Sequence, residues 1–466
     1  MDWEALQAAT AGEVILRDAP EYASACRLPV ARFDGGFLSR AQTARPEAVV
    51  LCKEPTDVSA TIAFARRFGL ETTARSGGHC FTGHSWTGGI VIDVSPMSTV
   101  SVSDGRATVG AGARLGEVYD ALEVDELTIA AGCGATVGIA GLALGGGVGI
   151  LGRLHGLTCD QLLGAEVVVA DGRVVDCDEE RDEELFWALR GGGGGNFGVV
   201  TSFLFRTVPA PASTAFHLVW PFSHAAGVIE AWQRWAPDAP EELAASVLIT
   251  VPGNLDRGPL VNLFGAMVGT QSETSALLDE LVGRIGTDPA TAALEHGSYV
   301  QTKRYLGGLG DQFEEIERDQ TQPVHSFSKS EFFEHSLPAE AVAALVEHLD
   351  EGRVAGESRE LDCMPFGGAY NRVPADATAF PHRGARFLLK HTVVVDPEAS
   401  RREKDAARLW LTRSWDSVHP WASGGVYVNF PDPDLVGAEH AYYGANYERL
   451  LSVKQQYDPD NFFRFR

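Results

Sequence analysis

Three glycine-rich segments in the first half of the chain have the residue types and spacing best suited to chemistry. Arg75-Ser-Gly-Gly-His79 follows a predicted strand, the run 138–149 follows Cys133, and Arg190 precedes five successive glycines. Because glycine has no Cβ, backbone N–H groups in such loops can approach an anion closely. Successive loops of this kind can cradle a pyrophosphate and lie against a flat ring. The alternative interpretation, tight turns that serve packing, suits one cluster better than three.

Familiar nucleotide and metal motifs do not describe these segments. The run Gly145-Gly-Gly-Val-Gly149 does not match the G-x-G-x-x-G pattern of a dinucleotide fold, and no Gly-Lys-Ser/Thr sequence follows any glycine run. His79, Cys80 and His84 have a spacing that a metal ion could use, but no second cluster completes four ligands. The sequence therefore predicts a nucleotide-type cofactor and no metal.

The elements that position these segments alternate between strands and helices. Residues 48–53, 71–75 and 88–94 are predicted strands, and 56–68 has helical spacing. The stretches VSVSDGRATVGAG and AEVVVADGRVVDC each indicate a hairpin, because Asp-Gly between alternating residues favours a tight two-residue turn. An α+β domain is expected to end near residue 208, at Val-Pro-Ala-Pro-Ala.

The region from about 210 to 424 has a different pattern. Strands such as FHLVWPF, SVLITV and RFLLKHTVVV accompany helices such as AEAVAALVEHL, which predicts an antiparallel sheet with helices on one face. The final stretch, 442–463, is predicted to be helical and to turn at Asp458-Pro459.

Composition excludes several classes of function. The 466 residues carry a net charge of −25, with a pI of about 4.9, which argues against binding nucleic acid or an anionic membrane. Neither a secretory signal nor an 18-residue apolar run is found. The seven cysteines are scattered and never spaced C-x-x-C, so a disulfide framework is not expected. These features favour a cytoplasmic protein.

Long motifs resemble the berberine bridge enzyme-like FAD oxidases of the vanillyl-alcohol-oxidase (PCMH-type) superfamily. They are RSGGHCFTGHSWTGGIVIDV, TVGIAGLALGGGVGILGRLHGLTCDQLLGAEVVVADGRVV, ELFWALRGGGGGNFGVVTSFLFR, AFPHR and YYGANYERLLSVKQQYDPDNFFR. The resemblance implies a PCMH-type FAD-binding domain with two α/β subdomains over residues 1–208. It also implies a substrate domain with a seven-stranded antiparallel sheet over 209–424, and a segment, 425–466, that returns to the first domain.

The same resemblance implies that His79 carries FAD through an 8α-N linkage. Many relatives add a second link through a Cys, which counted back from Thr136 would stand at Gly134 in this chain. Cys133 lies one residue early, so it is either a second link or a buried free thiol, and Cys80 is a weaker candidate. Val137 resembles the family's small oxygen gate, which favours an oxidase.

The cofactor-binding residues that the resemblance implies lie mostly in the glycine-rich segments and the tail. They are Arg75, Ser76, Gly77, Gly78, His79, Cys80, His84, Ser85, Cys133, Gly134, Thr136, Val137, Gly138, Gly141, Leu142, Gly145, Gly146, Gly149, His155, Gly156, Asp160, Gly194, Asn196, Gly198, Val200, Tyr442 and Asn446.

Removal of a hydride from a substrate carbon requires a base for the other proton. Resemblance places Tyr442 in that role, Tyr370 as a second active-site tyrosine, and Lys390 on a strand that faces the flavin. By alternation Lys390 and Thr392 share one face and His391 takes the other. Tyrosine packing and a solvent-facing lysine are the alternatives.

Three functions remain open at this level. The first is an FAD-dependent oxidase that dehydrogenates an alcohol, sugar or polycyclic secondary metabolite and reduces O2 to H2O2. The second is an oxidative cyclisation enzyme of natural-product biosynthesis, which the Ala/Arg/Gly-rich, bacterial-type composition suits. The third is a flavin-binding module without turnover. The expected partners are a small-molecule substrate and O2, and the expected assembly is a monomer or homodimer.

Overall fold

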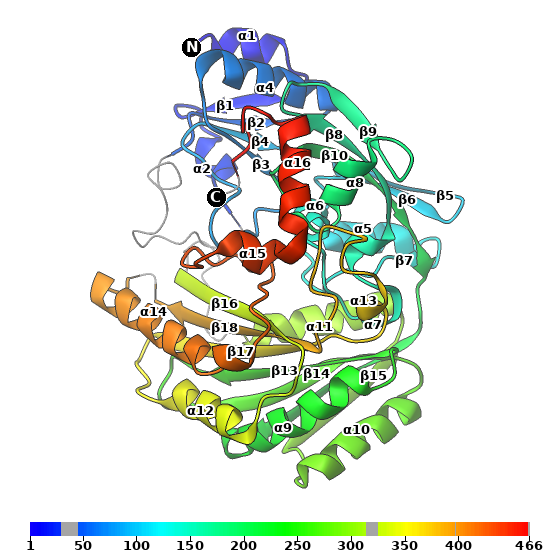
Figure 1. The fold of residues 1–466 in the computed structure, drawn as a ribbon, viewed down its shortest axis with the longest axis vertical. Helices are drawn as coiled ribbons and strands as arrows, with labels where there is room; N and C mark the ends of the chain where they lie inside the picture. Colours follow the sequence, from blue (N-terminus) through cyan, green and yellow to red (C-terminus); the bar gives the residue numbers. More distant parts are fainter. Residues whose placement is uncertain (29–44, 314–324, 397, 465–466) are drawn as a thin grey trace.

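The computed structural model describes residues 1–28, 45–313, 325–396 and 398–464, which form three main sheets. The first sheet has the strand order β1-β2-β4-β3, and the second has the order β5-β6-β10-β8-β9. The third has the order β15-β12-β14-β13-β17-β18-β16. In Figure 1 the first two sheets and the C-terminal helix lie together above the third sheet. The mixture of helices with mostly antiparallel sheets confirms the predicted α+β class.

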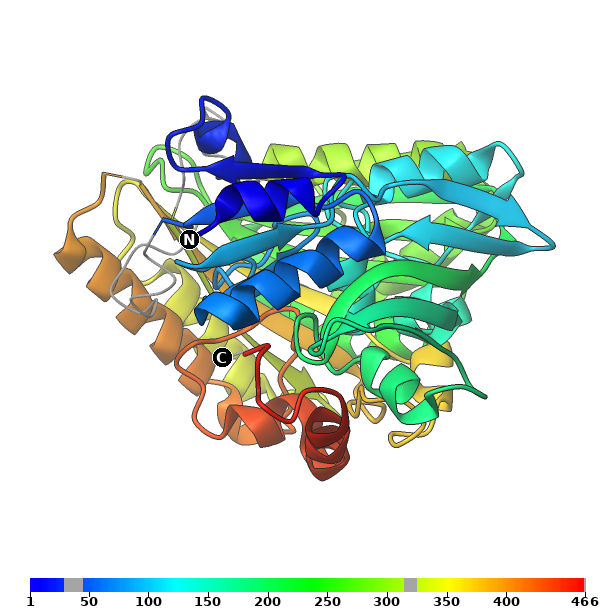
Figure 2. The same cartoon turned by 90° about the horizontal axis from the view of Figure 1, so that it is seen from above.

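The first sheet is built on parallel pairing of β2 and β3 with β4, whereas β1 runs antiparallel to β2. The predicted strands and the helix are all present, as β2 (Ala48–Leu51), β3 (Thr72–Arg75), β4 (Ile90–Asp93) and α4 (Pro55–Phe68), together with β1 (Glu13–Leu16), α1 (Trp3–Ala8) and α2 (Tyr22–Ala25). Helix α4 packs against β4 on one side and β8 on the other, and thereby joins the first two sheets (Figure 2).

The second sheet is antiparallel throughout and contains both predicted hairpins. Its strands are β5 (Val100–Ser103), β6 (Arg106–Gly110), β8 (Leu162–Val169), β9 (Val174–Cys177) and β10 (Gly198–Arg206). Asp104 and Gly105 have φ angles of 51° and 68°, as a type I′ turn requires. The second hairpin differs from the prediction, because Val169 N–H bonds to the Arg173 carbonyl and leaves a three-residue loop.

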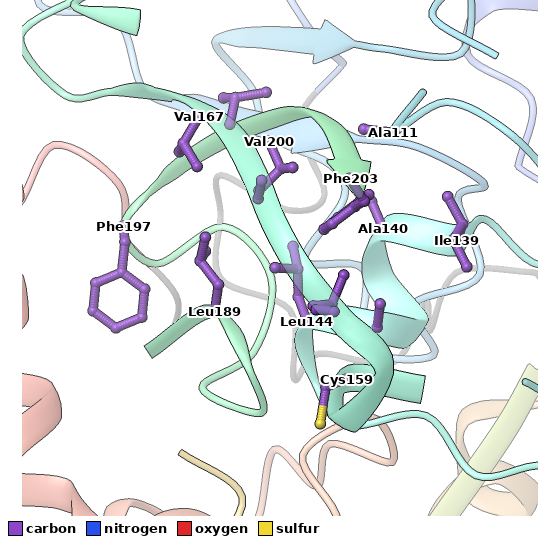
Figure 3. Close-up of a cluster of buried hydrophobic side chains, with 14 of the residues drawn as sticks. Ala111, Ile139, Ala140, Leu144, Cys159, Val167, Leu189, Phe197, Val200 and Phe203 are labelled. Carbon is purple, nitrogen blue, oxygen red and sulfur yellow. The ribbon is translucent and has the colours of Figure 1, made fainter. Parts of the chain in front are cut away.

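Short elements connect these strands and carry most of the glycine-rich segments. They are α5 (Leu115–Glu123), β7 (Leu127–Thr128), α6 (Ile139–Leu144), α7 (Gly152–His155), η1 (Thr158–Gln161), α8 (Glu183–Leu189) and β11 (Val208–Pro209). The apolar side chains of α6, β8 and β10 meet in one buried cluster (Figure 3). This cluster fixes the chain on both sides of the second glycine-rich segment.

The third sheet is antiparallel and contains the predicted strands as β12, β13 and β18. Its strands are β12 (Ser213–Pro221), β13 (Leu243–Val251), β14 (Leu260–Val268), β15 (Thr291–Gly297), β16 (His325–Phe333), β17 (Glu357–Pro365) and β18 (Phe387–Val395). One face carries a hydrophobic core with α9 (Ala225–Trp235), α10 (Gln271–Ile285) and α12 (Ala339–Asp350). Helix α14 (Arg401–Asp416) packs on β16 and β18 of the same sheet.

The opposite face of this sheet, which we call the inner face, lies toward the first two sheets. Leu388 on β18 and Met364 on β17 pack into the core of the N-terminal part, whereas Leu361 and Leu389 pack into the core beneath the helices. Helix α11 (Tyr299–Phe313) also lies on this side (Figure 1). The inner face is therefore the surface that a ligand held by the N-terminal part would contact.

The C-terminal residues return to the N-terminal part of the molecule. Helix α16 (Tyr447–Tyr457) packs against α8, and Lys454 donates to the Asn196 carbonyl at 2.6 Å. The predicted turn at Asp458 is present, but the predicted single helix is not. Helix α15 (Ala438–Tyr443) ends before Gly444, whose φ of 51° interrupts the helical path. Among the described residues, no helix has the length and apolar character needed to span a bilayer.

Arg153 fastens the N-terminal part to the third sheet. Its guanidinium, on α7, is 1% exposed and donates to the carbonyls of Pro237, Ala239, Pro240 and Leu243 at 2.6–3.2 Å. A buried guanidinium needs several acceptors to offset its lost hydration. The contacts therefore lock the chain after the second glycine-rich segment onto the loop that leads into β13.

We predict that Arg153→Met lowers the free energy of unfolding by about 3 kcal/mol, because four buried carbonyls lose a charged donor. Urea denaturation followed by circular dichroism measures the change. The matched control is Arg372→Met, since Arg372 forms an exposed pair with Glu241; it should change stability by less than about 1 kcal/mol. Equal effects of the two substitutions would contradict this role for Arg153.

Candidate functional site

The segment after β3 holds His79 in a half-buried position between fixed neighbours. Arg75, at the end of β3, forms a buried ion pair with Asp93 at 2.6 Å, and Ser76 donates to the Ala111 carbonyl at 2.7 Å. His79 Nε2 is buried and has no hydrogen-bond partner among the described residues. Burial lowers the pKa of His79, while a hydrogen bond with the Thr136 backbone acts in the opposite direction. His79 is therefore a neutral imidazole at neutral pH.

Two glycines bring the His79 segment against the second glycine-rich segment. A Cβ on Gly77 would lie 2.2 Å from the Gly138 backbone nitrogen, and a Cβ on Gly138 would lie 2.3 Å from the Gly77 nitrogen. No side chain fits at either position, so the two backbones touch directly. The predicted residues Gly78, Thr136 and Val137 adjoin this contact.

The predicted cofactor-binding residues that follow His79 in the sequence have different polar contacts. Cys80 Sγ lies 3.5 Å from the Thr82 hydroxyl, and the Ser85 hydroxyl is buried without a partner among the described residues. Loss of hydration lowers the pKa of His84 to about 4, so its ring is neutral. Neutral rings and unpaired polar atoms around His79 suit a bulky, partly polar ligand better than a cation.

Cys133 and Gly134 occupy different environments. Cys133 packs against a small cluster that includes Ala266, Leu306 and Leu309, on β14 and α11. A Cβ on Gly134 would touch only Val137 Cγ2, at 3.0 Å, and would otherwise enter open space. The position where the resemblance expects a linking cysteine is thus open, and the thiol one residue earlier lies beside the third sheet.

Several predicted cofactor residues shape the cradle through the backbone. A Cβ on Gly141 would meet nothing within 4 Å and one on Gly194 would meet only Leu144 Cδ1, whereas Gly145, Gly146 and Gly149 approach other parts of the chain closely. Leu142 accepts from Asn429 through its carbonyl, at 3.0 Å. Gly198 and Val200 lie on β10 and are buried in its core.

Three predicted polar residues, Asp160, Asn196 and Asn446, hold loops in place. Asp160 forms a buried ion pair with Arg383 at 2.7 Å. Asn196 donates to the Gly192 carbonyl at 2.7 Å, and Asn446 donates to the carbonyls of Ala375 and Thr378 at 2.7 and 3.1 Å. His155 is partly buried at the end of α7, which lowers its pKa, and Gly156 follows it with a φ of 90°. Direct contact of these four side chains with a cofactor stays a prediction.

Lys390 lies on the inner face, as its strand alternation predicts. His391, its neighbour, points to the other face and bonds to Ser414 on α14 at 2.9 Å. Lys390 Nζ lies 3.8 Å from Asp362 on β17 and 4.9 Å from the centre of the Phe430 ring. The predicted division of the strand between two faces is confirmed.

The inner face also carries functional candidates that the sequence analysis missed. Asp362, on β17, pairs across the sheet with Lys390, which in turn pairs with Ser330 on β16. One oxygen of Asp362 and the hydroxyls of Ser330 and Thr392 are buried without a partner among the described residues. Burial raises the pKa of Asp362, and Lys390 opposes this rise. The alternation of Glu360 and Asp362 with buried residues in ESRELDCMP was the signal for these positions.

Aromatic rings join the inner face to the His79 segment. The Phe430 ring lies between Lys390 and Phe81, and the Phe81 and Phe430 centroids are 6.1 Å apart. Phe81 is two residues after His79. A small cavity beside Phe81 is lined by Ser328 of β16 and by Asp432. The arrangement can hold a flat ligand at His79 and a polar molecule against Asp362 and Lys390.

The two predicted catalytic tyrosines are buried and hydrogen-bonded. Tyr442 Oη accepts the Asp432 N–H at 2.8 Å, and its carbonyl accepts from His382 Nε2 at 3.0 Å. Tyr370 Oη accepts the Gly149 N–H at 3.2 Å and donates to the Gly149 carbonyl at 3.0 Å. Burial raises the pKa of both phenols well above their usual range. Catalysis by either tyrosine stays a prediction.

Family models match both ends of this architecture. A model described as FAD binding domain matches residues 46–178, and one described as Berberine and berberine like matches residues 426–466. The first match covers the His79 segment and the whole of the second glycine-rich segment, 138–149. The second covers Phe430, Tyr442 and the returning helix.

Similar proteins span the whole chain. The FAD-linked oxidoreductase YgaK of Bacillus subtilis is 32% identical over 97% of this chain and 96% of its own length. Berberine bridge enzyme-like 1 of Arabidopsis thaliana is 30% identical over 90% of this chain and 83% of its own length. The solved structure of Physcomitrella patens BBE-like 1 has a TM-score of 0.85 at 25% identity and covers 100% of this chain and 98% of that one.

We predict that Tyr370→Phe lowers the free energy of unfolding by about 1–2 kcal/mol, because the half-buried Gly149 N–H and carbonyl both lose their partner. Thermal or urea denaturation measures this. Tyr447→Phe, at a partly exposed ring, is the control and should leave stability nearly unchanged. An unchanged stability of Tyr370→Phe would show that these hydrogen bonds do not hold the loop.

Proposed function

Because the chain belongs to the berberine bridge enzyme-like family of FAD-dependent oxidoreductases, we propose that it oxidises a hydroxyl-bearing small molecule between His79 and the inner face. The observation that carries this proposal is the group formed by Asp362, Lys390, Thr392 and Ser330. Asp362, Thr392 and Ser330 each have a buried polar atom without a hydrogen-bond partner in the described part of the chain. Such atoms are costly unless a ligand satisfies them.

The residues around His79 fit an FAD. The imidazole is neutral, so a ring nitrogen has the lone pair that a covalent bond to the flavin needs. The touching backbones of Gly77 and Gly138, and the open space at Gly141, suit a flat ring and a pyrophosphate. We propose a single covalent link, through His79. Cys133 is not assigned a link, because it packs beside α11 one residue away from the open position at Gly134.

FAD, when bound, would supply the acceptor for the hydride (two electrons and one proton) that leaves the substrate carbon. Asp362 is assigned to accept the hydroxyl proton, because one of its carboxylate oxygens is buried and has no partner among the described residues. Lys390 holds that carboxylate by charge at 3.8 Å. Thr392 and Ser330 are placed to bond the substrate oxygen, and Phe81 and Phe430 limit the entry of water.

Tyr442 is retained as a second candidate for the base. Its hydroxyl accepts a hydrogen bond from Asp432 N–H, which favours the ionised form, but burial raises its pKa more strongly. Asp362 needs less perturbation to be ionised near neutral pH. The proposed acceptor is O2, with H2O2 as product, in keeping with the small side chain of Val137. Oxidative cyclisation would use the same base and the same face.

Mixing the anaerobic protein with a panel of alcohols and sugars tests the function. Loss of the flavin's visible absorbance with at least one donor, followed by peroxide formation when air is admitted, is the expected result. A protein whose flavin is reduced by dithionite but by no donor, and which forms no peroxide, would be a flavin-binding module instead.

We predict that Asp362→Asn slows flavin reduction by the best donor at least about 100-fold, because the amide cannot accept the proton. In the unchanged protein the rate should rise with pH as Asp362 ionises, above the ordinary carboxyl range because burial raises its pKa. This rise should vanish in Asp362→Asn.

Stopped-flow absorbance measures both effects, and Tyr442→Phe is the comparison. We expect a loss of less than about tenfold for Tyr442→Phe, since its hydroxyl positions the Asp432 backbone. A larger loss in Tyr442→Phe than in Asp362→Asn would transfer the role of base to Tyr442.

A further inference from the structure

A buried ammonium group lies behind the loop that leads into Gly134. Lys303, on α11, is 4% exposed, and its Nζ donates to the carbonyls of Ala131 and Gly132 at 2.5 and 3.0 Å. Nζ also donates to the Tyr119 hydroxyl at 3.1 Å, and that hydroxyl donates to the Gly132 carbonyl at 2.7 Å. One charged side chain of α11 thus holds the backbone of this loop in place.

This ammonium has no carboxylate counterpart in the described part of the chain. Its hydrogen-bond acceptors are two backbone carbonyls and a phenol, and none of the described acidic residues forms an ion pair with it. The ring centres of Tyr119 and Tyr299 lie 4.7 and 5.0 Å from Nζ, which favours a cation at this point. Because a buried charge loses its hydration and is normally paired with an opposite one, Lys303 leaves an excess positive charge in the interior.

The chain that continues from these carbonyls forms the wall beside His79. The Thr136 backbone bonds to the His79 ring. A Cβ on Gly134 would meet only the Val137 side chain and would otherwise enter open space. Lys303 therefore binds the segment directly before the residues that we propose to face the flavin.

Oxidation of an alcohol by hydride transfer adds one negative charge to the flavin. The hydride carries two electrons and one proton away from the substrate carbon, while the hydroxyl proton passes to Asp362 and the substrate becomes a carbonyl compound. We propose that the ammonium group of Lys303 stabilises this negative charge, because a fixed positive charge in the interior acts strongly on a nearby anion. The inference rests on the proposed function, since it requires FAD at this loop.

Sulfite tests this role without knowledge of the substrate. It donates its sulfur electron pair to oxidised flavin to form an N–S bond, and the adduct loses visible absorbance and carries its added negative charge on the ring. The sulfite dissociation constant of the FAD-loaded protein therefore measures how well the site stabilises negative charge on the flavin.

We predict that Lys303→Met raises the sulfite dissociation constant at least about tenfold, because the anionic adduct loses the counter-charge behind the loop. Absorbance titration measures the constant. Arg304→Met is the matched control, since Arg304 is the next residue of α11 and its exposed guanidinium pairs with Asp120 at 2.9 Å. It should change the constant less than about twofold. Thermal melting and flavin content show that each variant is folded and loaded, and Lys303→Gln replaces Lys303→Met if the latter loses flavin.

The pH dependence separates the charge of Lys303 from its packing. Burial lowers the pKa of Lys303 to about 8, so the side chain loses its charge as the pH rises through that value. Among the described residues, the ionisable groups that face it are Tyr119 from α5, Cys133 from the loop and Tyr299 from its own helix. Burial raises the pKa of both tyrosines well above the usual range. The ratio of the dissociation constant of Lys303→Met to that of the unchanged protein should therefore fall toward one at high pH, and the ratio cancels the titration of sulfite itself.

An unchanged dissociation constant in the Lys303 variants would overturn the proposal, as would an equal rise in Arg304→Met. A ratio that stays the same on both sides of the Lys303 pKa would also overturn it, because a role in packing alone gives that result. Failure of the proposed function looks different: no alcohol or sugar reduces the flavin, while sulfite binding still responds to Lys303.

Discussion

The contact between Gly77 and Gly138 is the constraint on which the site depends. Two loops from different parts of the chain meet backbone to backbone there, at a distance that no Cβ could enter. The buried pair of Arg75 and Asp93 fixes one loop, and the core around α6 fixes the other. His79 is consequently held by its neighbours, at the position where we propose that it bonds the flavin.

The third sheet completes the site because its two faces differ in chemistry. One face is apolar and packs against helices, which stabilises the sheet. The inner face keeps Asp362 and Lys390 at half-buried positions, and one oxygen of Asp362 has no hydrogen-bond partner among the residues that the structure describes. Arg153 holds this face against the N-terminal part. The loops proposed to bind the flavin and the polar face of the third sheet are therefore fixed relative to each other.

Local features of the sequence were predictable, whereas partners across the sheet were not. The turn at Asp104 and the helix α4 follow from their own residues, and alternation correctly placed Lys390 opposite His391. Asp362 was missed, because its candidate role depends on Lys390 of β18. Only the register of the folded sheet brings these two side chains together. The helix predicted to begin at 442 and to turn at Asp458 is interrupted at Gly444, whose φ of 51° lies outside the helical region, and it resumes as α16.

Peptide mapping of the protein as purified tests the central claim most directly. After acid denaturation and proteolysis, mass spectrometry should find one FAD-sized increment, on the peptide that contains His79. The same increment should disappear in His79→Ala and persist in Cys133→Ala. Flavin that is released entirely on denaturation, or an increment on the Cys133 peptide alone, would contradict the account.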